Sequence, residues 1–130
     1  MYQPVTPAAA SRRIDRMEEE EKEDLFVQAV DAFGEKMLDE AIRLYRQALE
    51  IDPKYQDALH GLARAQFDNG NVDDAIETAK RMTANDPDDI LAHTSLSMFY
   101  QSRGMIEEAE REGNAARVLG WKEDLKKPHP

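Results

Sequence analysis

The pentapeptide Val72-Asp73-Asp74-Ala75-Ile76 decides the fold, because it occurs three times in related form. It reads Leu38-Asp39-Glu40-Ala41-Ile42 upstream and Ile106-Glu107-Glu108-Ala109-Glu110 downstream, so its alanines are spaced by 34 residues. Other pairs keep this spacing: Asp52-Pro53 and Asp86-Pro87, Gly70 and Gly104, Ala58 and Ala92, Leu62 and Leu96, and Phe33 and Phe67. Self-similarity at one fixed period indicates a supersecondary unit that is stacked several times.

Each 34-residue unit is predicted to contain two helices. In the middle unit, apolar residues recur at helical spacing from Ala58 to Phe67, and Asp68-Asn69-Gly70 then marks a turn. A second apolar stripe runs from Val72 to Met82 and is followed by Asp86-Pro87, which stops a helix. These patterns predict helices near 19–35, 38–51, 55–69, 72–85, 89–103 and 106–119.

A 34-residue helix–turn–helix unit with these landmarks resembles the tetratricopeptide repeat family. The matching residues are Leu25, Ala29, Ala41, Tyr45, Ala48 and Pro53 in the first unit, Leu59, Leu62, Ala63, Gly70, Ala75 and Pro87 in the second, and Leu96, Tyr100, Gly104, Ala109 and Ala116 in the third. The resemblance covers roughly residues 22–123. It implies an all-α, right-handed superhelical solenoid of three repeats, at about 22–55, 56–89 and 90–123, in a domain spanning residues 18–121.

Three positions depart from the family pattern. Gln28 occupies a usually apolar place, His93 replaces a large apolar side chain, and Gly113 takes another such place. A glycine inside a helix costs up to about 1 kcal/mol relative to alanine. The third unit is therefore predicted to be the most loosely packed.

The N-terminal segment differs in character from the repeats. Residues 1–17 contain Pro4 and Pro7, which favour an irregular segment. One alternative is a helix capped by Ser11 that continues into the acidic run after Met17. Another is a docking segment anchored by Ile14 and Met17.

The C-terminal end is predicted to leave an apolar edge. Gly120 is a typical helix stop, and residues 122–130 are expected to form a tail. The last unit of a repeat array has no successor to cover it. Trp121 and Leu125 either form a one-turn lid over that edge, or the edge stays open for a second copy or a partner.

Composition excludes several classes of function. The chain has 27 acidic and 17 basic residues, for a net charge of −10, which disfavours nucleic-acid binding. It has no cysteine, which excludes disulfides and thiolate sites. No apolar run approaches the roughly 18 residues of a membrane span, and no secretory signal is recognisable. The cytoplasm is the predicted location.

No catalytic, metal or cofactor site is predicted. The three histidines, His60, His93 and His129, have no ligand partner at metal-binding spacing. The carboxylates lie mostly on helix exteriors, and the glycines punctuate turns rather than form a phosphate-binding loop. The sequence therefore predicts a protein that is not an enzyme.

The resemblance implies a concave groove lined by the first helix of each repeat. Its lining is expected to be Glu23, Phe26, Val30 and Phe33, then His60, Arg64 and Phe67, then Leu91, Thr94, Met98 and Gln101. The family's carboxylate clamp for chaperone C-termini uses two lysines, two asparagines and an arginine. Those places hold Phe26, Val30, Gly61, Leu91 and Ser95, so a carboxylate-clamp co-chaperone is a poor fit. The groove is instead predicted to be apolar, with Arg64 as its main charge, unless the first helix is turned so that Phe26, Val30 and Phe33 form its packing face.

Two functions follow from this surface. The first is a protein–protein interaction module, an adaptor, scaffold or assembly subunit, whose groove binds a helix or extended segment of another protein. The alternative is a self-associating structural protein that uses its C-terminal edge or its N-terminal segment.

Overall fold

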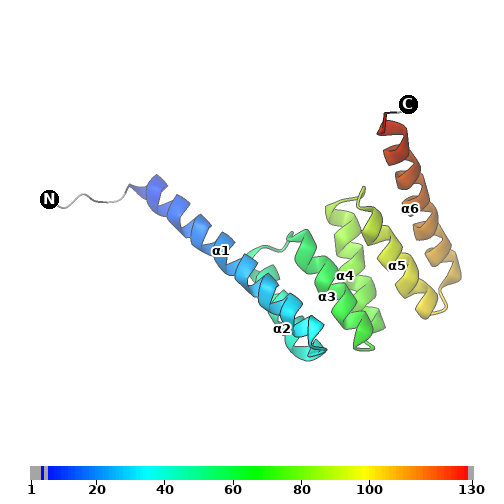
Figure 1. Ribbon diagram of the computed structural model, residues 1–130, viewed down its shortest axis with the longest axis horizontal. Coiled ribbons are helices and arrows are strands. Elements are labelled where there is room, and N and C mark those ends of the chain that lie inside the picture. Colours follow the sequence, from blue (N-terminus) through cyan, green and yellow to red (C-terminus); the bar gives the residue numbers. More distant parts are fainter. Residues whose placement is uncertain (1–3, 5, 129–130) are drawn as a thin grey trace.

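The computed structural model describes residue 4 and residues 6–128, and these form six α-helices and no strand (Figure 1). The helices are α1 (Pro7–Gly34), α2 (Leu38–Ile51), α3 (Gln56–Asp68), α4 (Val72–Asn85), α5 (Ile90–Ser102) and α6 (Ile106–Lys126). Each helix packs mainly against its neighbours in sequence, and α1 also contacts α3. The predicted all-α solenoid of helical hairpins is confirmed.

The same turn closes each of the three hairpins. The second residue after α1, α3 and α5 has a positive φ, 63° at Lys36, 84° at Gly70 and 75° at Gly104, and these residues are 34 apart. The next amide then donates back across the helix end: Met37 N to Ala32 O at 2.9 Å, Asn71 N to Gln66 O at 2.8 Å and Met105 N to Tyr100 O at 2.9 Å. This pattern satisfies carbonyl groups that the helix end leaves without a partner.

Small residues allow the helices of each hairpin to approach closely. Ala41, Ala75 and Ala109 are fully buried or nearly so. The largest fully buried side chains, those of Leu59, Met82, Leu96 and Phe99, come from α3, α4 and α5. The core therefore runs through the middle of the solenoid, where a helix has neighbours on both sides.

The last helix contributes least to the core. Ala109 is the only buried residue of α6, whereas α2 has six and α4 has five. A Cβ at Gly113 would lie 3.4 Å from the Ser97 hydroxyl, so this glycine sits where α6 comes close to α5. What the structure shows is that α6 has no following helix to cover its outer face, and the looser packing of the third unit stays a prediction.

Both ends of the chain are more helical than the sequence predicted. The irregular segment 1–17 is wrong for residues 7–17, which belong to α1; residues 1–3 and 5 lie outside the described residues. Pro7 stands at the first helical position, where no N–H is needed, and the Thr6 hydroxyl accepts the Ala9 amide at 3.1 Å.

The C-terminal tail predicted for residues 122–130 is also wrong in part. Helix α6 continues through Gly120 to Lys126, because Gly120 keeps a helical backbone instead of turning left-handed. Trp121 and Leu125 therefore extend the helix and stay exposed, and they do not fold back as a lid.

Candidate functional site

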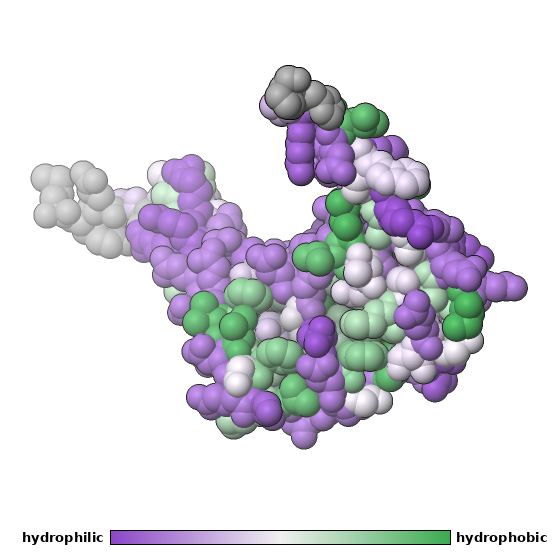
Figure 2. Space-filling view, turned by 45° about the vertical axis from the view of Figure 1, so that its right-hand side comes forward, coloured by the Kyte–Doolittle hydropathy of each residue, from purple (hydrophilic) through white to green (hydrophobic). Residues whose placement is uncertain are grey.

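The predicted groove residues lie on α1, α3 and α5, in two classes of exposure. Val30, Arg64, Leu91, Thr94, Met98 and Gln101 are exposed, whereas Phe26, Phe33, His60 and Phe67 are half-buried. Figure 2 shows apolar side chains gathered on one face of the solenoid between polar borders. The exposed large apolar residues of these helices include Leu91 at 66% and Val30 at 43%, and Val27, which was not predicted, at 57%.

The first helix turns its small residues toward α2. Ala29 and Ala32 are its buried residues, with Leu25, Phe26 and Phe33 packed partly against the core. Val30 lies outside this packing face. The alternative in which Phe26, Val30 and Phe33 together form the packing face is therefore wrong for Val30.

Phe26 joins an aromatic cluster at the start of the face. Its ring centroid is 6.0 Å from that of Tyr45 on α2 and 5.4 Å from that of Tyr55, which precedes α3. The ring of Tyr45 occupies the space that a Cβ at Gly61 would need, with its nearest atoms 2.3–2.6 Å from that position. Such tilted pairs are favourable beyond the area they bury. Phe26 is thus an anchored side chain and not a free contact residue.

The Lys22 side chain of α1 lies beside this aromatic cluster. Lys22 Nζ donates to Asp52 Oδ2 at 2.7 Å and lies 4.8 Å from the centroid of the Tyr55 ring. The hydrogen bonds to Asp52 and Glu19 raise the pKa of Lys22 despite its burial. The side chain of Lys22 is 13% exposed, so the contact ties α1 to the end of α2.

His60 belongs to a polar network between the second and third units. Its Nε2 is 2.6 Å from Asp89 Oδ2, and Gln56 Nε2 donates to the same oxygen at 2.8 Å. The other oxygen, Oδ1, accepts the Ala92 amide at the start of α5. Burial acts to raise the pKa of Asp89, but these hydrogen bonds outweigh it and hold the pKa below its usual value. His60 is therefore a structural contact between the second and third units.

The remaining predicted residues differ in how far their side chains are held. Arg64 Nε donates to Asp68 Oδ1 at 3.0 Å, one helical turn later, while 59% of its side chain stays exposed. Phe67 stacks on Phe99 of α5, with centroids 4.8 Å apart. Arg64, Val30, Leu91 and Met98 are thus the side chains of this face that a partner could reach.

The known proteins that resemble this chain share its repeat architecture. The family model described as tetratricopeptide repeat matches residues 32–99, more than half of the chain. The chain belongs to the tetratricopeptide repeat family. No curated protein sequence matches the chain.

Solved tetratricopeptide structures superimpose on most of the chain. A crystal structure of MamA matches with a TM-score of 0.78 and 23% identity, over 80% of this chain and 61% of that chain. The first tetratricopeptide domain of Spaghetti (RPAP3), bound to the HSP90 peptide SRMEEVD, matches with a TM-score of 0.74 and 19% identity, over 77% and 79%. The Sgt2 domain from Aspergillus fumigatus matches with a TM-score of 0.74 and 26% identity, over 77% and 66%. The chain thus spans about three fifths of the MamA chain it matches.

The five places that the family resemblance assigns to a carboxylate clamp hold no clamp residue. The five places hold Phe26, Val30, Gly61, Leu91 and Ser95, which carry no charge and no amide. Gly61 is covered by the Tyr45 ring, and Phe26 is held by its aromatic neighbours. A chain-terminal carboxylate would therefore meet apolar and small side chains here.

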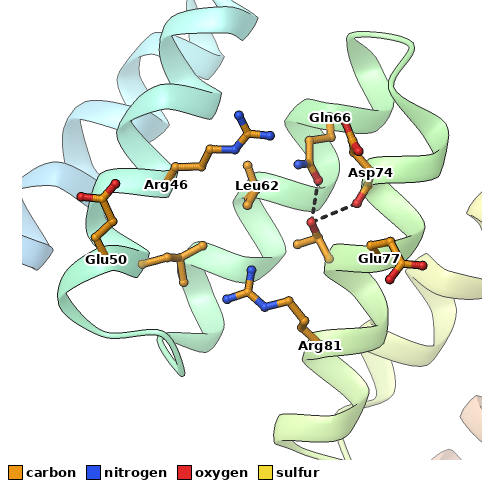
Figure 3. Close-up of a pocket in the computed structure, with 9 residues that line it drawn as sticks. Arg46, Glu50, Leu62, Gln66, Asp74, Glu77 and Arg81 are labelled. Atoms are coloured by element: carbon orange, nitrogen blue, oxygen red, sulfur yellow. Dashed lines mark hydrogen bonds between the residues drawn. The ribbon is translucent and has the colours of Figure 1, made fainter.

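A second hollow lies on the α2 and α4 side, and no sequence pattern predicts it. A cavity of about 440 Å³ is lined by Arg46, Leu49, Glu50, Leu62, Gln66, Asp74, Glu77, Thr78 and Arg81. Figure 3 shows Arg46 of α2 and Arg81 of α4 reaching toward the space over Leu62 of α3. At one side the Thr78 hydroxyl donates to Gln66 Oε1 at 2.7 Å, a buried contact between α3 and α4. Arginines stand beside three carboxylates, so the cavity selects neither sign of charge.

Two further properties of the structure bear on other functions. Residue 4 and residues 6–128 hold no group of three or more His, Asp or Glu side chains arranged to bind a metal ion. Within the same part of the chain, no helix has the length and apolar character that crossing a membrane requires.

Proposed function

We propose that this tetratricopeptide protein is an interaction module that binds an amphipathic helix or an extended apolar segment of another protein. The binding face is the surface formed by α1, α3 and α5, and the module has no catalytic role. A cytoplasmic location stays a prediction.

The exposed apolar side chains on α1 and α5 are the observation that carries the proposal. Val27, Val30, Leu91 and Met98 are exposed although they sit on helices whose other faces are well packed. Apolar side chains grouped on one surface are typical of protein-binding sites, and each anchor that a partner buries contributes about 1.5–3 kcal/mol. The half-buried rings of Phe26, Phe33 and Phe67 would add contact surface that is already held in place by packing against the core.

The chemistry of the face indicates the chemistry of the partner. Because the clamp places are apolar, a partner is expected to present apolar side chains at helical or alternating spacing instead of a terminal carboxylate. Arg64, near the middle, favours an acidic side chain beside those anchors. The Spaghetti (RPAP3) domain holds a peptide, which supports a peptide-binding role for this face without indicating the same peptide.

Affinity capture from native lysate with point variants tests the proposal. Val30→Glu and Leu91→Glu change exposed residues on α1 and α5, so each is expected to fold normally and to weaken partner binding by about 10- to 100-fold. Met37→Glu serves as the matched control, because Met37 is similarly exposed but lies in the turn between α1 and α2. Capture of the same partner by all four proteins, with unchanged circular dichroism, would reject this face as the site.

A further inference from the structure

The two ends of the chain carry helix that the repeats do not cover. Lys22 is the point at which α1 is tied to α2, and residues 11–21 before it are all exposed. At the other end, residues 121–126 of α6 are all exposed. Figure 1 shows the two helix ends projecting to the same side from opposite ends of the solenoid, and Figure 2 shows the open space between them. We call residues 7–21 the N-terminal arm and residues 117–127 the C-terminal arm.

The C-terminal arm presents a continuous apolar stripe. Val118, Trp121 and Leu125 follow one another at spacings of three and four, which places them on one face of α6. They are 43%, 63% and 78% exposed. A single exposed apolar residue is ordinary, but a tryptophan flanked by two aliphatic residues on one helix face is typical of interfaces.

The N-terminal arm presents a shorter stripe of the same kind. Ile14 and Met17, three residues apart, are 54% and 62% exposed. The arm is a regular helix started by the Thr6 cap, so it offers this pair on a preformed surface. A preformed helix lowers the ordering cost of binding.

The charges of the two arms are complementary. The N-terminal arm contains five acids, Asp15 and Glu18–Glu21, and three arginines, Arg12, Arg13 and Arg16, for a net charge of −2. The C-terminal arm contains four basic residues, Arg117, Lys122, Lys126 and Lys127, and two acids, for a net charge of +2. In a protein whose total charge is −10, most contacts between copies are repulsive, whereas contact between these arms is attractive.

We propose that the protein forms a two-fold dimer in which the N-terminal arm of each copy packs along the C-terminal arm of the other. The arms of one copy leave from opposite ends of the solenoid, so the contact is between copies. A two-fold axis brings both pairs together at once, because it places each arm beside its complement. Ile14 and Met17 then cover the stripe around Trp121, and Glu18 and Glu21, which share their helix face, lie toward the lysines. The proposal does not depend on the groove.

The single tryptophan of the chain makes the test direct. Trp121 is the only one, so its fluorescence reports on the proposed interface alone. The interface is small, and dimers of that class are weak, so the full chain is measured by light scattering from about 1 to 300 µM. We expect the mass to rise toward twice that of the monomer while the Trp121 emission moves to shorter wavelength over the same concentrations. A constant mass, or a rise in mass that leaves the emission unchanged, overturns the proposal.

Variants in each arm test whether the N-terminal arm is the surface that covers Trp121. Met17→Glu and Leu125→Glu keep the tryptophan, change only exposed residues, and are expected to abolish both the mass increase and the emission shift. Met37→Glu, at a similarly exposed position outside both the arms and the binding face, is the matched control and should dimerise like the wild type. Raising NaCl from 0.05 to 0.5 M should weaken the wild-type dimer, because the charge pairs are exposed. Loss of the dimer in Leu125→Glu with an undiminished dimer in Met17→Glu would show that another surface covers Trp121 and would overturn the proposal.

Discussion

His93 of α5 faces Glu112 of α6, with Nδ1 2.6 Å from Glu112 Oε2, while its Nε2 is 2.7 Å from the carbonyl oxygen of Pro87. Both partners are acceptors, so both ring nitrogens donate only when the imidazole is protonated. Burial acts to lower the pKa of His93, but the hydrogen bonds to Glu112 and Pro87 and the charges of Glu112 and Asp89 raise it above its ordinary value. The contact therefore joins the two helices of the third repeat through an ionised pair.

The stability of the third repeat is expected to fall as the pH rises. Because the pKa of His93 is raised on folding, its contribution is fully present below the ordinary histidine pKa of about 6.5 and is lost as the pH rises through the folded value. Urea unfolding of the wild type and His93→Gln, from pH 6 to 9, measures the difference between them. We expect the advantage of the wild type to be about 1–3 kcal/mol at pH 6 and to shrink toward pH 9. A difference that stays constant over this range would show that His93 does not titrate against Glu112.

Lys36→Gly is expected to stabilise the protein. Lys36 has a φ of 63° at the position where the other two hairpins have Gly70 and Gly104. A non-glycine residue there costs roughly 1–2 kcal/mol, of which the greater freedom of unfolded glycine cancels a part. We expect a gain of about 0.5–1 kcal/mol in the free energy of unfolding. Gly70→Lys, the reverse exchange at the equivalent turn, should lose at least as much, and equal stability of all three proteins would contradict the strain.

Ala75→Leu is expected to overpack the middle repeat. Ala75 is fully buried on α4 where that helix approaches its neighbours. Extra methylenes in a packed core cost about 1–3 kcal/mol, which a thermal melt detects readily. Ala84→Leu is the control, because Ala84 lies on the same helix but is exposed. Equal melting temperatures for the two variants would mean that position 75 is not a close contact.

The repeated part of the fold could be predicted from the sequence because its signals are local. Helices α2 and α4 have the predicted bounds, 38–51 and 72–85, since each lies between a turn and an Asp-Pro pair. The ends could not be predicted this way. A proline and a glycine predict breaks in a helix, whereas Pro7 is compatible with a first helical turn and Gly120 with a helix interior.

The face formed by α1, α3 and α5 could also be predicted only in part. Its helices and most of its exposed residues follow from the 34-residue period. The contacts that hold Phe26, His60 and Phe67 half-buried involve Tyr55, Asp89 and Phe99, which are 29–32 residues away in sequence. Such contacts depend on how one repeat stacks on the next, and no local pattern encodes that distance.

Gly61→Ala tests the contact between Gly61 of the second repeat and the Tyr45 ring of the first. An added Cβ would lie 2.3–2.6 Å from the ring of Tyr45, which is buried against Phe26 and has no open space into which to turn. In an exposed helix, glycine to alanine stabilises by roughly 0.5–1 kcal/mol. Here overpacking of about 1–3 kcal/mol should outweigh that gain. Gly120→Ala is the matched control, because a Cβ there meets nothing within 4 Å and the helix benefit should appear alone. Opposite shifts of the two melting temperatures are therefore expected, and a stabilised Gly61→Ala would mean that Tyr45 can leave the cluster at little cost.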